Sequence, residues 1–229
     1  MILVGIAILL NIAAVAGKCG QCKHCLHKDD CLLNVITVWS NNGVVDWQRV
    51  LEENSEFDPR FEENFRNMDA IGMLHRGAYH YFKGEPGSAS ADAQLQNFMN
   101  TITQAGFDEK KDFAVVNVEI FKNEGSDKNA FTEKLVNYVT LLKSKVPNVV
   151  IHANSDQWAT LVNTEHDDFF AQFPLSVIDY NNVQSPTLPR PWTTWQRWLY
   201  TKEVPVNGIS GPVWLSRVNC SVKMMPCIF

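Results

Sequence analysis

One acidic residue, Glu119, stands within an otherwise almost entirely apolar stretch near the middle of the chain. Residues 113–121 contain seven apolar residues out of nine, which predicts a strand buried on both faces. Side chains alternate along a strand, so Asn117 and Glu119 share one face. A buried carboxyl has a raised pKa unless a positive charge or several amides stabilise its anion. It is therefore either a proton donor opening onto a cleft or a structural glutamate paired with an arginine or backbone amides.

Strands that alternate with helices surround this segment and must position it. Residues 61–72, 90–104, 128–144 and 156–162 have helical periodicity, and the apolar runs 32–39, 76–82, 149–152 and 175–180 are typical of strands. This alternation predicts a parallel sheet, whose carboxyl ends carry the chemistry in an α/β barrel. Two further strands, 194–200 and 213–215, follow without a helix between them. The chain of 229 residues suits one domain of barrel size.

Composition and the first residues indicate an exported protein. The net charge is −5 and no basic cluster interrupts the chain, which argues against a nucleic-acid partner. Residues 1–17 hold no charge before Lys18 and include Ala14-Val15-Ala16, a small-x-small pattern typical of signal-peptidase cleavage. This apolar run is short for a membrane span, and no later segment is apolar enough to cross a bilayer. We therefore expect a secretory signal peptide over 1–17 and a soluble, secreted mature protein without a membrane partner.

Six cysteines gather near the two ends of the mature chain. Four lie in a Cys-rich segment, 18–31, and two near the carboxyl terminus: Cys19, Cys22, Cys25, Cys31, Cys220 and Cys227. In an exported chain this arrangement favours disulfides, with at least one bridge between the two ends, and the pairing stays open. The alternative is a zinc module formed by the N-terminal four.

Seven short motifs, in one order, resemble those of glycoside hydrolase family 25, the lysozymes that cut the muramic acid linkage of peptidoglycan. They are Asp46-Trp47-Gln48, Asp58-Pro59-Arg60-Phe61, residues 76–82 (Arg-Gly-Ala-Tyr-His-Tyr-Phe), 116–119 (Val-Asn-Val-Glu), 177–180 (Val-Ile-Asp-Tyr), Trp195-Gln196, and 208–211 (Gly-Ile-Ser-Gly). The resemblance covers residues 33 to about 216. It implies an irregular TIM-like β/α barrel over residues 32–229, closed by antiparallel strands, with a groove over the strand ends.

The resemblance also implies the roles of individual residues. Glu119 would be the general acid, and Asn117 and Asp179 would complete the catalytic group. Tyr79, Tyr180 and Trp195 would contact the glycan. Tryptophans can stack on sugar rings, yet ordinary core packing is the more frequent role of such residues. That alternative applies to Trp39, Trp192, Trp195 and Trp198. Neither a cofactor nor a metal is needed for this chemistry.

The sequence departs from the family pattern at three acidic positions and in length. Thr37, Asn117 and Trp214 stand where the family carries aspartate. Only residues 51–57 separate the Trp47 helix from Asp58, which is too short for the strand that the family has there. A barrel short of a strand must change its tilt and stagger to close. The sequence is therefore consistent with a truncated barrel or with an incomplete gene model.

Two functions remain open at this point. The first is a secreted muramidase, weakened by the lost acids, that degrades bacterial cell wall in antibacterial defence or digestion, outside the cell or in a digestive vacuole or lysosome. The second is a catalytically inactive homologue that only binds peptidoglycan or a related glycan. In either case we expect a monomer.

Overall fold

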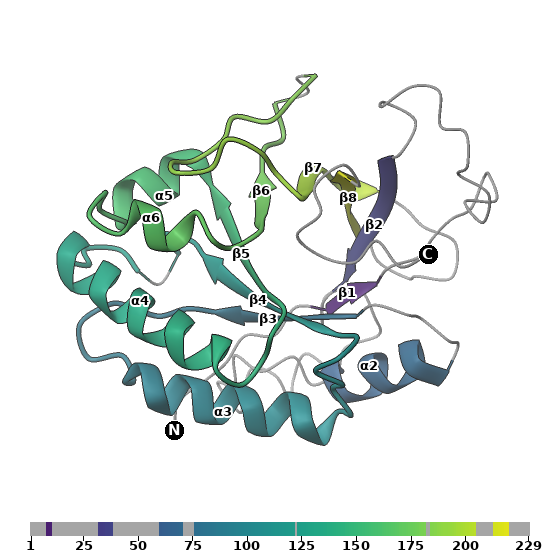
Figure 1. Cartoon of the computed structure of the whole chain (residues 1–229). Helices are drawn as coiled ribbons and strands as arrows, with labels where there is room; N and C mark the ends of the chain where they lie inside the picture. Colours follow the sequence, from purple (N-terminus) through teal and green to yellow (C-terminus); the bar gives the residue numbers. More distant parts are fainter. Residues whose placement is uncertain are drawn as a thin grey trace.

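We describe the protein from a computed structural model of the chain (Figure 1). The structure describes residues 8–10, 32–38, 60–70, 76–121, 123–181, 184–204 and 213–219. Its strands are β1 (Ile8–Leu10), β2 (Leu32–Val38), β3 (Gly77–Tyr81), β4 (Phe113–Val118), β5 (Val149–Asn154), β6 (Leu175–Ile178), β7 (Arg197–Val204) and β8 (Val213–Asn219). Its helices are α2 (Phe61–Ala70), α3 (Ala91–Gln104), α4 (Lys128–Lys143), α5 (Ser155–Leu161) and α6 (Asp167–Phe170).

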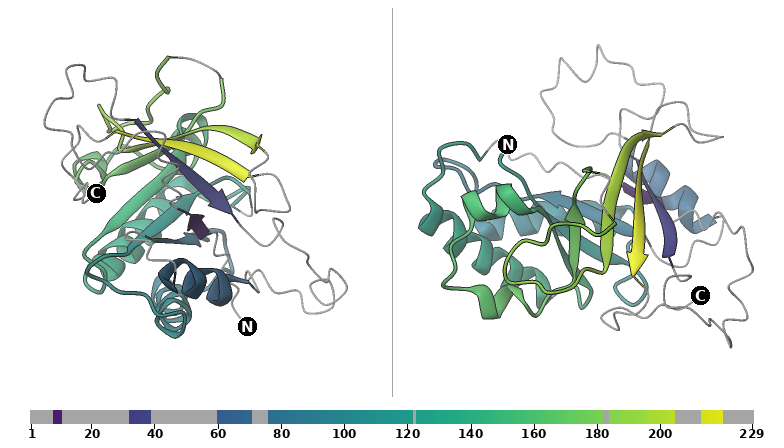
Figure 2. Two further views of the ribbon diagram at one scale, coloured as in Figure 1. Left: turned by 90° about the vertical axis from the view of Figure 1, so that its right-hand side faces the viewer. Right: turned by 90° about the horizontal axis from the view of Figure 1, so that it is seen from above.

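The strands form a closed barrel in the order β1-β2-β8-β7-β6-β5-β4-β3. Strands β3 to β7 are parallel to one another, whereas every pair that includes β1, β2 or β8 is antiparallel. Figures 1 and 2 show α3 and α4 together outside the parallel strands, while β7, β8 and β2 lie on the side away from these helices. This confirms the expected irregular TIM-like β/α barrel.

The three-residue strand β1 occupies the gap where the sequence lacks a strand. It pairs antiparallel with β2 on one side, where Leu9 lies opposite Thr37, and with β3 on the other, where Leu9 lies opposite Gly77. These residues belong to the predicted signal peptide. Cleavage after residue 16 or 17 would remove β1, so the predicted leader and the closed barrel cannot both describe the mature chain.

The two faces of β4 separate the core from the barrel interior. Ala114, Val116 and Val118 are fully buried in the hydrophobic core, together with Phe131 and Leu135 of α4. The other face carries Val115 and Asn117 into the barrel, as the alternation of side chains predicts. Ser90 caps α3, and Asp127 caps α4, each by accepting a backbone N–H in the first turn. These caps set where the covering helices begin.

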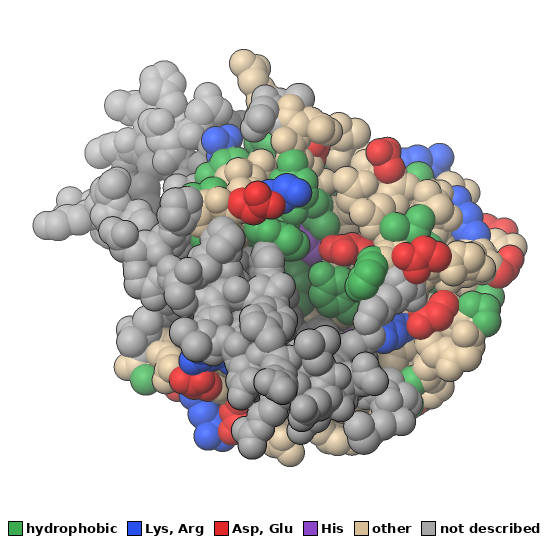
Figure 3. Space-filling view, turned by 180° about the vertical axis from the view of Figure 1, so that it is seen from behind, with side chains coloured by type: hydrophobic (Ala, Val, Ile, Leu, Met, Phe, Trp, Pro, Cys, Tyr) green, Lys and Arg blue, Asp and Glu red, His purple; other side chains and the backbone are tan. Residues whose placement is uncertain are grey.

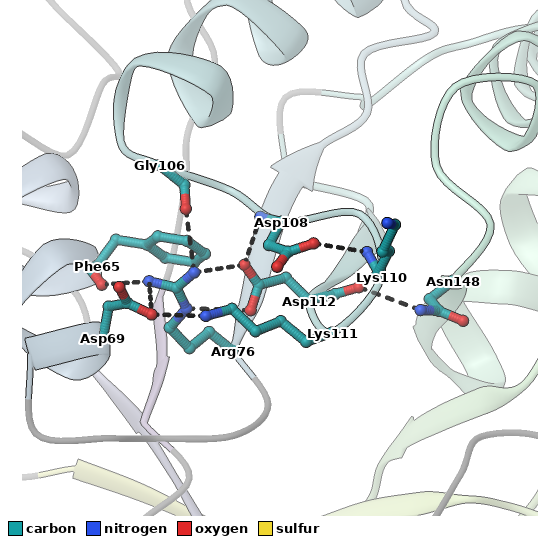
Figure 4. A network of polar contacts seen from close by, with 9 residues as sticks. All are labelled: Phe65, Asp69, Arg76, Gly106, Asp108, Lys110, Lys111, Asp112 and Asn148. Carbon is teal, nitrogen blue, oxygen red and sulfur yellow. Dashed lines mark hydrogen bonds and ion pairs between the residues drawn. The ribbon is translucent and has the colours of Figure 1, made fainter.

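A buried ion pair holds together the amino-terminal ends of β3 and β4 (Figure 4). Arg76 donates from Nε and Nη2 to the two carboxylate oxygens of Asp112 at 3.0 and 2.6 Å, and both residues are at most 1% exposed. The remaining guanidinium donors reach the carbonyl oxygens of Phe65 at 2.9 Å and Gly106 at 3.1 Å. This network ties α2, β3 and the α3–β4 loop at the end opposite to the carboxyl ends of the strands.

The structure corrects the predicted end of the central strand. Strand β4 ends at Val118, so Glu119 is the first residue beyond it rather than a residue within it. Both faces of the predicted strand were expected to be buried, but Ile120 is 37% exposed and Phe121 is 60% exposed. Strand β7 begins at Arg197 rather than 194, and the short helix α6 was not predicted. Across the described part of the chain, no helix combines the length and apolarity needed to span a bilayer.

Candidate active site

The carboxyl ends of the parallel strands surround the mouth of the barrel. On the face shown in Figure 3, hydrophobic side chains gather around a hollow with a histidine at its floor and acidic groups at its edge. Pairing register places Tyr81, Asn117, His152 and Ser176 at one level across β3 to β6, and Arg197 of β7 continues this level. Glu119 follows two residues beyond Asn117. The sequence therefore builds a polar layer inside the barrel, below the Glu119 carboxyl.

Glu119 and Asn117 are in direct contact. Asn117 Nδ2 donates a hydrogen bond to Glu119 Oε1 at 3.1 Å. Burial raises the pKa of the Glu119 carboxyl, and the bond from Asn117 opposes that rise only in part. Asn117 is 2% exposed, and its Oδ1 has no hydrogen-bond partner among the described residues. The site therefore offers a carboxyl whose pKa is raised by burial and, beside it, an acceptor without a partner among the described residues.

Two tyrosines flank this carboxyl. The negative charge of Glu119 contributes to raised pKa values of Tyr81 and Tyr180, although burial is the larger cause for both. Tyr180 also packs edge-to-face with Trp214, with ring centroids 6.5 Å apart, and Lys202 Nζ lies 5.6 Å from the Tyr180 ring centroid. Tyr180 was predicted, whereas Tyr81 was not. The alternation rule could have found Tyr81, because it lies two residues beyond Tyr79 on the same strand face.

Tyr79 was predicted to contact the glycan, and the structure places its side chain deep inside the barrel. It is 2% exposed, packs with Val115 and Val150, and accepts a hydrogen bond from Arg197 Nη1. The ring of His152 meets Tyr79 edge-on at 5.2 Å. Burial, together with the nearby charge of Arg197, lowers the pKa of His152 to about 3, so this histidine is neutral at physiological pH. These groups form the floor beneath Glu119 rather than its walls.

Asp179 serves the loop that follows β6. Its Oδ1 accepts the backbone N–H of Asn181 at 3.0 Å, its Oδ2 accepts that of Thr187 at 2.9 Å, and the residue is 4% exposed. Among the described contacts, none joins Asp179 to Glu119. The structure therefore brings Asn117 to Glu119 and gives the Asp179 carboxylate a structural task.

Three of the tryptophans considered as sugar contacts, Trp192, Trp195 and Trp198, pack in or against the hydrophobic core. Trp195 precedes β7, at the amino-terminal end of that strand, and its ring lies 6.0 Å from that of Trp198. The indole N–H groups of Trp192 and Trp198 donate to the carbonyl oxygens of Phe173 and Asp179, each at 2.8 Å, and both rings are buried in the core. This placement favours the core-packing interpretation. Trp39 lies outside the described residues.

Two of the positions where the motifs predict a departure from the family are neighbours. Thr37 of β2 and Trp214 of β8 are register partners in the antiparallel pair. The two expected departures therefore lie at one level of the barrel. Trp214 also contacts the ring of Tyr180, which flanks Glu119.

The cysteine predictions cannot be compared with the structure, because Cys19, Cys22, Cys25, Cys31, Cys220 and Cys227 all lie outside the described residues. Disulfides and the zinc alternative therefore stay predictions. In the described part of the chain, no cluster of three His, Cys, Asp or Glu side chains could hold a metal ion.

The sequence profile of glycosyl hydrolases family 25 matches residues 36–209, which include Tyr81, Asn117, Glu119 and Tyr180. The chain belongs to this family. Among curated proteins it is similar to Lysozyme M1 of Streptomyces globisporus, with 24% identity over 200 residues. That match covers 80% of this chain and 66% of the relative, so this chain spans slightly under two thirds of the length of Lysozyme M1.

Solved structures agree with this assignment. A bacterial lysozyme from Streptomyces coelicolor is 26% identical, with a TM-score of 0.59 over 71% of this chain and 75% of that one. The modular autolysin LytC of Streptococcus pneumoniae, solved with a synthetic peptidoglycan ligand, shares the fold at 18% identity. Its TM-score is 0.55 over 77% of this chain and 44% of that one. The family 25 barrel is therefore shared with these proteins.

Proposed function

We propose that this family 25 chain is a secreted lysozyme that hydrolyses the muramic acid linkage of bacterial peptidoglycan, with Glu119 as general acid. The observation that carries the proposal is the Glu119 carboxyl itself. It stands at the carboxyl end of a barrel strand, its pKa is raised by burial, and Asn117 orients it from 3.1 Å. A carboxyl with a raised pKa at the mouth of a barrel can supply the proton that glycosidic bond cleavage requires.

The reaction uses the proton on Glu119 first. Glu119 donates it to the glycosidic oxygen while the bond from that oxygen to the anomeric carbon breaks. Positive charge then develops at the anomeric carbon, and the acetamido oxygen of the same sugar attacks it. The resulting Glu119 carboxylate takes a proton from the water that opens this intermediate. One side chain thus acts as acid and then as base.

Asn117 supports the attack of the acetamido group. Its Nδ2 is committed to Glu119, and its buried Oδ1 is an unused acceptor among the described residues. An acetamido group carries one N–H, which this oxygen can accept, so that the acetamido oxygen turns toward the anomeric carbon. An amide does this without the negative charge of an aspartate, so we propose that activity is retained and reduced.

Similar proteins support the choice of substrate. The relatives reported above are called lysozymes, and the LytC structure holds a synthetic peptidoglycan ligand. The competing proposal is a wall-binding homologue without activity. A turbidity assay on purified peptidoglycan, with co-sedimentation measured in parallel, separates the two. Clearing supports the enzyme, whereas co-sedimentation without clearing supports the binder.

Asn117→Asp should raise the rate of wall cleavage by about 10- to 100-fold. The new carboxylate would restore the negative charge that the developing cation lacks. It would also stand about 3.1 Å from Glu119, where like charges disfavour ionisation and raise the pKa of Glu119 further. The acid would then stay protonated to higher pH, so the alkaline limb of the pH–rate profile should move upward. Asn163→Asp, a matched change in a loop away from Glu119, should alter neither. An Asn117→Asp protein that folds and gains no activity would contradict this role.

Secretion predicts a specific mature terminus. Protein collected outside the cell should begin at about residue 17 or 18, because the small-x-small pattern ends at Ala16. Edman degradation or intact-mass measurement of that material checks this. A mature chain that still contains Ile8–Leu10 would show that β1 stays in the barrel and would refute the leader.

A further inference from the structure

We infer that Asn123 is a positioning residue that clamps the β4 end and thereby fixes Glu119 at the mouth of the barrel. The inference rests on the proposed role of Glu119 as general acid and extends it to a residue with no chemistry of its own. Asn123 lies four residues beyond Glu119, in the loop between β4 and α4, and it is 2% exposed.

The Asn123 side chain joins two neighbouring strand ends. Its Nδ2 donates to the carbonyl oxygen of Glu119 at 2.8 Å and to that of Phe82 at 3.0 Å. Its Oδ1 accepts the backbone N–H of Gly84 at 2.8 Å. Both amide hydrogens and one of the two lone pairs of the oxygen are thus used. Asn123 thus connects the backbone of Glu119 to Phe82 and Gly84, which follow β3.

The turn between these residues is fixed from two further directions. Asn123 N donates to the carbonyl oxygen of Ile120 at 2.8 Å, which closes the turn after Glu119. From α5, Gln157 Oε1 accepts the backbone N–H of Ile120 at 2.7 Å. The backbone directly after the acid therefore has partners on β3, on α5 and within its own turn. Such bracing keeps a catalytic side chain within a narrow range of positions.

The position of Gly84 shows that the approach to Asn123 is tightly constrained. A Cβ on Gly84 would lie 2.1 Å from the Phe131 ring, so only glycine lets the chain pass this ring and present its N–H to Asn123. Phe131 in turn packs edge-to-face with Phe82, whose carbonyl oxygen accepts from Asn123. The packing of Phe131 against Phe82 and Gly84 therefore also positions the backbone groups that bind Asn123.

The direction of the effect follows from what the clamp prevents. Without the two N–H donors of Asn123, the turn after β4 can move away from β3 and admit water to the Glu119 carboxyl. Hydration stabilises the charged carboxylate, so the pKa of Glu119 falls toward its ordinary value. A displacement of the acid by about 1 Å can also lower the turnover rate by about 100-fold without a comparable change in substrate affinity.

The test uses the full chain carrying Asn123→Ala, with Asn163→Ala as the matched control. Asn163 also braces a loop, through bonds to Asn129 and Glu165, but it makes no contact with Glu119. The titration of Glu119 is followed by carbon NMR, assigned with Glu119→Gln. We expect Asn123→Ala to lower the titration midpoint of Glu119 by about half a pH unit or more and Asn163→Ala to leave it unchanged. Steady-state kinetics should show kcat reduced about 10- to 100-fold, with KM altered less than about threefold.

The outcomes separate this inference from the proposed function. If the wild type cleaves no peptidoglycan, the proposed function fails, and the NMR titration still decides whether Asn123 positions Glu119. An unchanged Glu119 midpoint in Asn123→Ala, with only the melting temperature lowered, would overturn the inference. Should Asn123→Ala not fold, Asn123→Ser replaces it, because a hydroxyl can keep one of the bonds. Failure of both to fold would mark Asn123 as a stability residue alone and would also overturn it.

Discussion

Glu119→Gln should lower the rate of peptidoglycan cleavage by about 100- to 10,000-fold, the usual contribution of a general acid. The substitution keeps the size of the side chain and a hydrogen-bond acceptor for Asn117 Nδ2, and it removes the proton that the leaving oxygen needs. Binding of peptidoglycan should be nearly unchanged, because binding does not depend on that proton. Turbidity and co-sedimentation assays on the same preparation measure both quantities.

Glu119→Gln should lower the cleavage rate without lowering the stability of the fold. The folded-state pKa of Glu119 is raised, so the folded protein holds this proton more tightly than the unfolded chain does. Glu119 therefore favours folding less as the pH rises from the unfolded value of 4.5 through the higher folded value. At neutral pH, Glu119→Gln should unfold at the same temperature as the wild type or at a higher one. A clear loss of stability with unchanged cleavage would mean that Glu119 is structural.

Arg76→Met should be the most destabilising single change at the opposite end of the barrel. It removes the guanidinium from a fully buried ion pair and leaves Asp112 without its charge partner, which typically costs about 3–5 kcal/mol. For a domain of this size that lowers the melting temperature by about 6–20 °C. Thermal unfolding followed by circular dichroism measures the change.

Arg66→Met provides the matched control for this prediction. Arg66 also pairs with a carboxylate, Glu62, at 2.7 Å, but the two side chains are 61% and 49% exposed. Exposed pairs contribute at most about 1 kcal/mol, so this variant should unfold close to the wild type. Equal stability of the Arg66 and Arg76 variants would show that the buried network contributes little to the fold.

Most of the fold was predictable because its elements carry strong local patterns. The strand at residues 113–118 and the helices at 91–104 and 128–143 contain periodic apolar residues. The two helices also begin at side-chain caps, Ser90 and Asp127. The end of β4 was less predictable, since apolar Ile120 and Phe121 continue the strand pattern into an exposed turn. The turn after the strand is held by a bond from Asn123 that joins segments 41 residues apart, and such a contact leaves no local signal.

The parts of the site whose residues lie close together in the sequence could be predicted. The parts whose placement depends on several strands and loops could not. Asn117 and Glu119 lie two residues apart at the end of β4, so the alternation expected there put them on one face, and the structure brings them into contact. The role of Asp179 depends on the loop that ends at Thr187, and the placement of Trp195 depends on where β7 begins. The short strand β1 had no sequence signal distinct from that of a leader, because an apolar run suits both.

The measurement that tests the central claim most directly is the chemistry of the ends that the protein creates. Purified wild-type protein is incubated with peptidoglycan, the soluble fragments are reduced with borohydride, and their ends are identified by mass spectrometry. The account predicts fragments with reduced N-acetylmuramic acid at their ends, formed by the wild type and not by Glu119→Gln. Fragments that end in N-acetylglucosamine, or no fragments from a protein whose circular dichroism shows an intact fold, would contradict it.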